Sequence, residues 1–456
     1  MERVWDLPGK AFEDAQRIDI LQTMRQPPYF LILLGQLFGL AQAQEPIRFG
    51  EDFVVGSQYH VSCRVAIEGT LRFVRGKEVS ATTLKITGKS AIDYDERVLQ
   101  VTAGNVERTV RHVQQWDFHR TVDGNEQSGK LRPTVALLVV QRLNNLELPF
   151  SPQGPLLASE IELIRTDVFT PALTGLLPQR AVKEGDEWPA TAAAVQELTD
   201  LERIHKGGLT CRFEGIEPTD RRLARISFRG VVRGLGEDGP AEHELEGYFY
   251  FDLHSRHLSY LSLQGVHRPL NADGLAQGEI KGTFTLTRRP ETKIAALSQE
   301  ALSRWTLTPT DDNTQLLFDH QEFRFLYPRH WRVEEAYGRQ VRLVEKQGSD
   351  VLITVDPPAR LPNSAQFQKE ASAGLVQQKG QILNSSIVRA VQTSPFIIEQ
   401  FGFDVRFGSQ LATFDYYVVR QRDGGGTLAA RYLPGQAEAR RREVERMARS
   451  LSVHLR

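Results

Sequence analysis

The feature that most constrains this fold is a series of short segments in which apolar and polar residues alternate between glycine-containing turns. From Tyr59 to Ile67 an apolar residue stands at every second position, which is the period of a strand with one buried face. The segments at 209–216, 222–232, 243–253, 257–267 and 278–288 follow each other with short turns between them. Successive strands joined by short turns predict an antiparallel meander.

Residues 53–148 also have β character, and Asp123-Gly124 is a typical hairpin turn. Residues 105–116 fit a helix or a strand equally well. A short helix is expected over 167–177, where Asp167 is suited to cap its start and Pro178 to end it.

The pattern changes near residue 290, and this change sets the predicted domains. Residues 44–290 are expected to form a large antiparallel sheet with few helices, and 291–312 a linker between two proline-containing segments. Residues 313–456 mix strands with helices at 363–379 and 435–451, so the chain as a whole is predicted to be α+β. In this second unit we expect Trp331 to point inward against the closing helix, near Val444 and Leu451.

The start of the chain predicts export. Met24-Arg25 precedes an uncharged apolar run of 11 residues, 30–40, that ends in Ala41-Gln42-Ala43. This order is that of a secretory signal peptide, and the run is too short for a membrane span of about 20 residues. We therefore expect translation to start at Met24, residues 1–23 to be a misassigned start, and cleavage after Ala43 to release a secreted or periplasmic protein without a transmembrane segment. The alternative is a buried N-terminal helix.

Charge and cysteine content narrow the range of partners. The chain has 56 Lys and Arg residues against 57 Asp and Glu residues and no basic block, so nucleic acid is not an expected partner. Cys63 and Cys211 are the two cysteines, and in an oxidising compartment they form a candidate disulfide. Two separately buried thiols are the alternative.

No motif points to catalysis, a cofactor or a metal. The sequence has no G-x-S-x-G, HExxH or CxxC pattern. The paired carboxylates Asp93 and Asp95 suit hydrolysis only if they face a cleft, and the glycines at 424–426 are expected to lie at a hairpin between two strands. Four histidines lie in or next to neighbouring predicted strands and are read as surface or turn residues rather than metal ligands: His243, His254, His257 and His267. We therefore predict no catalytic residue, no cofactor and no metal, and we favour a protein that is not an enzyme over one that is.

Residues 313–456 resemble the PsbP-like family, an α/β/α sandwich. The resemblance rests on a strand ending in Tyr327-Pro328 with Trp331 close behind, a helix after the first group of hairpins, and a terminal helix ending at 448–451. It implies attachment to a larger assembly and an absence of catalytic residues.

Residues 44–290 are similar to the curved-sheet fold of the lipoprotein carriers of the bacterial envelope, since both have a long antiparallel sheet interrupted by a short helix. They also resemble uncharacterised secreted bacterial proteins that carry a helix, Leu-Pro, and Val-Lys-x-Gly-Asp-x-Trp, here Leu177-Pro178 and residues 182–188.

These observations lead to an expected function. We expect a non-catalytic secreted or envelope protein that binds a hydrophobic ligand or a protein partner; a secreted hydrolase with a site assembled from distant residues and a pure scaffold protein are the alternatives. Phe249 and Phe251 alternate with Tyr248 and Tyr250, so one face of that strand is suited either to an acyl chain or to ordinary core packing.

Overall fold

The computed structural model describes residues 45–74, 81–143, 146–218 and 222–454. Residues 1–44 lie outside the described residues, so the signal peptide, its cleavage after Ala43 and the start at Met24 stay predictions. In the part of the chain that is described, no helix combines the length and the apolar character needed to span a bilayer. The described chain is mostly antiparallel sheet with few helices, which agrees with the predicted α+β class.

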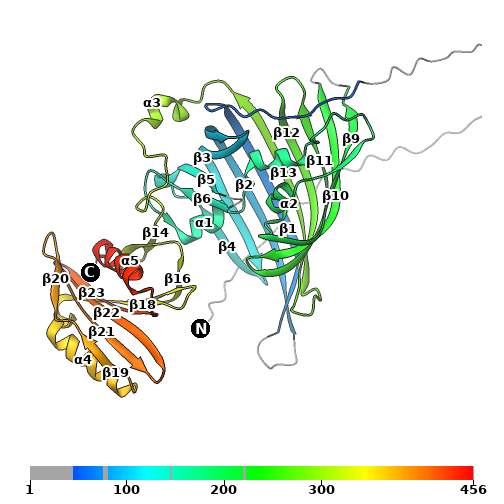
Figure 1. Cartoon of the computed structure of the whole chain (residues 1–456). Helices are drawn as coiled ribbons and strands as arrows, with labels where there is room; N and C mark the ends of the chain where they lie inside the picture. The colour runs from blue at the N-terminus through cyan, green and yellow to red at the C-terminus, as the bar shows by residue number, and fades with distance from the viewer. Residues whose placement is uncertain (1–44, 75–80, 144–145, 219–221, 455–456) are drawn as a thin grey trace, which may run out of the picture.

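A 12-stranded sheet dominates the first part of the chain (Figure 1). The strands run in the order β6-β5-β3-β2-β1-β13-β12-β11-β10-β9-β8, with β4 beside β3. β1 pairs antiparallel with β13, so the first and last strands of this sheet meet in its middle. The strands are β1 (Gln58–Val74), β2 (Ala81–Thr102), β3 (Asn105–Val122), β4 (Asn125–Lys130), β5 (Leu137–Leu143), β6 (Leu146–Phe150), β8 (Glu187–Pro189), β9 (Arg203–Ile216), β10 (Leu223–Gly236), β11 (Gly239–Asp252), β12 (His257–Pro269) and β13 (Gly278–Glu291).

The meander predicted from alternation is confirmed, and the segment at 105–116 belongs to strand β3. The hairpin between β3 and β4 turns through Asp123 and Gly124, which have φ angles of 50° and 86°. Positive φ at both central residues matches the right-handed twist of the strands, and Asp-Gly is a pair that tolerates it.

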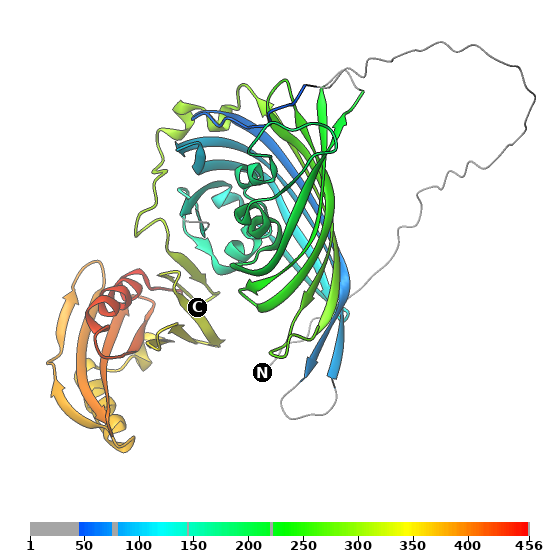
Figure 2. The same ribbon diagram turned by 45° about the vertical axis from the view of Figure 1, so that its right-hand side comes forward.

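Short helices cover the inner face of the curved sheet (Figure 2). They are η1 (Pro133–Val135), α1 (Ala158–Ile164), η2 (Thr170–Leu176) and α2 (Ala192–Thr199). Val61, Cys63, Phe249 and Phe251 point to this side and are at most 1% exposed. Because apolar residues alternate along the strands, one face of the sheet is apolar and packs into a single core with the helices.

The segment predicted as a linker packs against the opposite face of the same sheet. It contains η3 (Ala295–Leu297) and α3 (Gln299–Leu302). Leu297 and Leu302 form a small second core with Val110, Val139 and Phe150. Residues 291–312 are thus held on β3, β5 and β6 through buried apolar contacts.

The last part of the chain forms an eight-stranded antiparallel sheet with a helix on each side. α4 contacts β19 and β21, whereas α5 contacts β15, β22 and β23. Tyr416 packs in the cluster under α4, and its neighbour Tyr417 packs on the α5 side. The eight strands are β16 (Trp331–Tyr337), β17 (Gln340–Glu345), β18 (Asp350–Asp356), β19 (Gln381–Ser385), β20 (Arg389–Gln392), β21 (Ile397–Phe407), β22 (Gln410–Gln421) and β23 (Gly424–Tyr432); the helices are η4 (Pro358–Arg360), α4 (Ser364–Gln377) and α5 (Ala437–Ser450).

A four-stranded sheet, β24-β15-β14-β7, connects the two regions. Its strands are β7 (Leu156–Leu157), β14 (Leu316–Asp319), β15 (Phe323–Tyr327) and β24 (Ser452–Val453). β14 pairs in parallel with β7, which precedes α1 in the first region. The second region is therefore joined to the first by backbone hydrogen bonds as well as by the chain.

Candidate functional site

A hollow of about 1620 Å³ lies against the outer face of the first sheet. Its lining extends from β4 on one side of the sheet to β8 and β9 on the other. The lining includes three exposed charged residues, Glu68, Lys89 and Glu246. Each is next in sequence to a residue whose side chain points to the core-facing side of the sheet. The hollow therefore opens to solvent on the side away from α1 and α2.

Charged side chains of both signs line this hollow. Glu244 pairs with Arg268 at 3.1 Å, and Lys281 approaches Glu279 at 3.8 Å. Several other lining charges form no ion pair within the described ranges: Glu68, Lys89, Arg229 and Glu246. Unpaired, exposed charges cost little in water and are available to groups of opposite charge.

A smaller hollow of about 390 Å³ adjoins the first and shares Arg229, Glu246 and Gln264 with it. At its margin Tyr248, Tyr250 and Tyr260 cluster, with ring centroids 5.5–5.9 Å apart. The Arg225 guanidinium lies over the Tyr248 ring, 4.2 Å from its centroid. The edge of the smaller hollow is thus a half-exposed patch of three tyrosines with the Arg225 guanidinium over one ring.

The face that turns toward the helices holds a buried ionic network. Arg111 Nε donates to Glu96 Oε2 and Arg111 Nη1 to Asp167 Oδ2, both at 3.0 Å. These three side chains are at most 1% exposed. Burial raises the pKa of Asp167, although Arg111 opposes this shift. The network attaches the segment before η2 to β2 and β3.

Asp167 therefore has a different role from the helix cap predicted for it. The helix at this place is a 3₁₀ helix that begins at Thr170, and Phe169 occupies its N-cap position without a side-chain cap. A buried arginine requires a counter-charge, and Asp167 supplies it. The predicted stop at Pro178 agrees with the end of η2 at Leu176.

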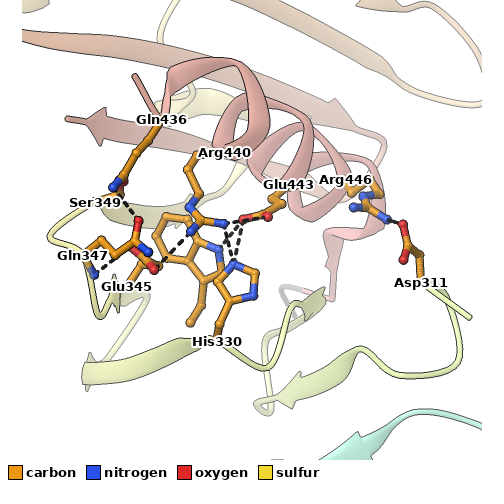
Figure 3. Close-up of polar contacts among 10 residues, drawn as sticks. Asp311, His330, Glu345, Gln347, Ser349, Gln436, Arg440, Glu443 and Arg446 are labelled. Atoms are coloured by element: carbon orange, nitrogen blue, oxygen red, sulfur yellow. Dashed lines mark hydrogen bonds and ion pairs between the residues drawn. The ribbon is translucent and has the colours of Figure 1, made fainter. Parts of the chain in front are cut away.

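A second polar cluster ties α5 to the sheet of the C-terminal region (Figure 3). His330 Nε2 lies 3.0 Å from Glu443 Oε2, to which Trp331 Nε1 donates at 2.8 Å. Arg440 donates to Glu443 Oε1 at 3.0 Å and to Glu345 Oε1 at 3.1 Å. Burial alone would raise the pKa of Glu443, but the hydrogen bonds from His330 and Trp331 hold that pKa below its usual value.

This cluster confirms the prediction for Trp331. The side chain is 2% exposed and belongs to the same core as Val444 and Leu451. His330, by contrast, is 41% exposed in its side chain. The cluster therefore holds α5 against β16 and β17, and His330 is its most exposed member.

The two cysteines are free and buried, so the candidate disulfide between Cys63 and Cys211 is not formed. Four strands lie between β1 and β9 in the sheet, which keeps the two residues apart. Cys63 Sγ instead donates to Asp167 Oδ1 at 3.4 Å. Burial and the nearby Asp167 raise the pKa of Cys63 well above its usual value, and burial raises that of Cys211 to about 12.

The carboxylates singled out in the sequence do not act as a pair. Asp93 binds Arg64 Nη2 at 2.8 Å, and Asp95 accepts hydrogen bonds from His60 and Gln114. Each carboxylate thus has its own partner. Phe249 and Phe251 are core residues that are at most 1% exposed, which is ordinary sheet packing.

The four histidines are dispersed except for two. His257 is buried beside the Arg288 carbonyl oxygen at 3.1 Å, and His254 lies exposed in the turn after β11. His243 and His267 face each other across β11 and β12. Within the residues that the structure covers, no group of three or more His, Cys, Asp or Glu side chains is placed to hold a metal ion.

The Val-Lys-x-Gly-Asp-x-Trp motif has a structural explanation. Trp188 is buried, and its indole nitrogen donates to the Leu176 carbonyl at 2.9 Å. Asp186 accepts the Lys183 backbone N–H at 3.0 Å and so closes the turn. The motif locks η2 onto the edge strand β8.

Sequence reasoning missed the outer-face hollow and the buried network. The sequence could have indicated the network, because Arg111 and Glu96 stand at positions of their strands that face the core. Charged residues are rarely buried there without a partner of opposite charge. The hollow had no signal, because its polar side chains alternate in the same way as on any solvated face.

No known protein-family model matches the chain, and no curated protein is similar to it. Among solved structures, the chain is similar to the cyanobacterial PsbP protein CyanoP of Synechocystis sp. PCC 6803, with 12% identity over 31% of this chain and 92% of that one and a TM-score of 0.25. The Ran-binding protein Mog1p of Saccharomyces cerevisiae gives 9% identity over 30% of this chain and 95% of that one, with a TM-score of 0.24. Lipovitellin gives 8% identity and a TM-score of 0.30 over 54% of this chain and 26% of that one.

Proposed function

We propose that this chain is a non-catalytic exported protein that binds a protein partner in the hollow on the outer face of its first sheet. The observation that carries the proposal is the hollow itself, which is wide, open and lined by unpaired charges of both signs. Within the proposal, the C-terminal region is a PsbP-like sandwich, an assignment supported by the helices on both faces of its sheet.

The size and lining of the hollow favour a protein surface as the occupant. Small-molecule sites usually enclose about 300–1,000 Å³ and are mostly apolar. Here about 1620 Å³ opens to solvent and includes Lys89, Arg229, Glu68 and Glu246. Such charges steer and orient a partner of complementary charge, and the half-exposed tyrosines at the margin are of the residue type that anchors interfaces.

A hydrophobic ligand is the less favoured occupant. It would need an apolar space on the helix-covered side of the sheet. The apolar residues described there, such as Cys63, Phe213 and Phe249, are fully buried against their neighbours. A hydrolase is not favoured either, since Asp93 and Asp95 each have another partner.

The experiment is native mass spectrometry of the protein isolated from its own source, compared between two charge-reversed variants. Lys89→Glu/Arg229→Glu changes the hollow, and Lys369→Glu/Arg406→Glu makes the same charge change on the exposed surface of the C-terminal region. We expect a bound protein in the wild type and the control but at least about a tenfold loss in the hollow variant. A bound lipid instead, or equal retention in both variants, would contradict the proposal.

The exported state has its own test. Sequencing the N-terminus of the protein recovered outside the cytoplasm should give Gln44 as the first residue. A recovered chain that still contains residues 24–43 would show that no signal peptide is removed.

A further inference from the structure

His243 and His267 form a cross-strand pair that nothing in the proposed function uses. They stand directly opposite each other on β11 and β12. His267 Nδ1 lies 3.2 Å from His243 Nε2, and the ring centroids are 4.6 Å apart. Both side chains are partly buried, so the backbone of two paired strands fixes their separation.

The separation of these nitrogens is that of two ligands on one metal ion. Imidazole nitrogens bind zinc at about 2.0–2.1 Å in tetrahedral geometry, which places two of them about 3.3 Å apart. A metal ion can therefore take the place of the shared hydrogen bond once the proton on the donating nitrogen moves to the other nitrogen of its ring.

We propose that His243 and His267 bind a divalent transition-metal ion such as Cu²⁺ or Zn²⁺ through these two nitrogens, with water in its remaining positions. Imidazole suits these ions, and Cu²⁺ stands highest in the affinity order of the divalent series. Two protein ligands make a weaker site than the three or four of a structural zinc centre.

The test is calorimetric titration of Cu²⁺ and Zn²⁺ into the full chain and three variants. His243→Gln and His267→Gln each remove one ligand and keep a polar side chain, whereas His254→Gln changes an exposed histidine in the turn between the same strands. We expect each ligand variant to bind at least about tenfold more weakly and the turn variant to bind like the wild type. Equal affinity in all four proteins would overturn the proposal.

Electron paramagnetic resonance of Cu²⁺ bound to the wild type tests the same site without any substitution. One equivalent of Cu²⁺ should show hyperfine coupling to two imidazole nitrogens. A spectrum with only oxygen ligands, or with more than one class of bound Cu²⁺ at one equivalent, would contradict the assignment even if a variant failed to fold.

Discussion

The two regions of the molecule use arginine–carboxylate clusters in different ways. In the first region, Arg111 joins Glu96 and Asp167, and all three side chains are at most 1% exposed. In the second region, Arg440 joins Glu443 and Glu345 beside His330, whose side chain is 41% exposed. The first cluster lies inside the core. In the second, the side chains of Arg440, Glu443 and Glu345 are 4–16% exposed, and His330 is the member in wide contact with solvent.

The difference shows how strongly burial determines the effect of removing a charge. When one member of a buried pair is removed, its partner remains as an uncompensated charge in a medium of low polarity. When one member of a pair nearer the surface is removed, water reaches more of the charge that remains. The predictions below test this contrast, beginning with the largest expected effect.

Arg111→Leu should be the most damaging of these changes. It leaves Glu96 and Asp167 buried without a cation, and we expect a loss of about 3–5 kcal/mol in the free energy of unfolding. Urea unfolding, monitored by hydrogen exchange of β2 and β3 peptides, measures this loss of stability in the first region. The matched control is Arg64→Leu, which breaks the outer-face pair with Asp93 at 2.8 Å and should change stability by no more than about 1 kcal/mol. Similar losses in the two variants would remove the contrast between buried and exposed ion pairs.

Trp331→Ala should have an effect of similar size in the other region, because it removes a side chain that is 2% exposed. Truncating a buried tryptophan costs about 3–5 kcal/mol. Trp331→Phe keeps most of the packing and loses the 2.8 Å hydrogen bond to Glu443, so about 1.5–3 kcal/mol is expected. Hydrogen exchange should increase in β16 and α5 peptides; an unchanged exchange rate there would mean that Trp331 is not part of this core.

Glu443→Gln should have a smaller and pH-dependent effect, about 1 kcal/mol near neutral pH. The pKa of Glu443 is below its ordinary value of 4.5 in the folded protein. The carboxylate therefore stabilises the fold above that pH, and the stabilisation is lost as the pH falls through the lowered pKa. Urea midpoints of the wild type and the variant should converge as the pH falls below 4.5 and through the lowered pKa. A difference that stays constant with pH would assign the effect to packing.

A reducing agent should have no effect on the stability of the first region. A disulfide that closed the loop from Cys63 to Cys211 would contribute about 4–5 kcal/mol in the chain-entropy model, but both thiols are free. Unfolding midpoints with and without dithiothreitol should coincide, and two thiols should react with a thiol reagent only after unfolding. No reaction with the thiol reagent after unfolding, together with a midpoint that falls on reduction, would indicate the bond.

Strand positions and face assignments were largely predictable from the sequence, because alternation depends on neighbouring residues alone. The meander from 209 to 286, the Asp123-Gly124 turn and the inward Trp331 all follow from such local patterns. The role of Asp167 did not follow, since its partner Arg111 is 56 residues away. For the same reason the free state of the cysteines depends on a strand order that no local pattern contains.

The sequence by itself determined which residues face the core and where the chain turns. Only the tertiary structure decided that β1 pairs with β13, which brings the two halves of the sheet together and forms the hollow on its outer face. It also decided that His243 and His267 meet while His254 and His257 do not. The physical reason is that strand pairing sets which distant side chains become neighbours, whereas alternation sets only the face on which each side chain lies.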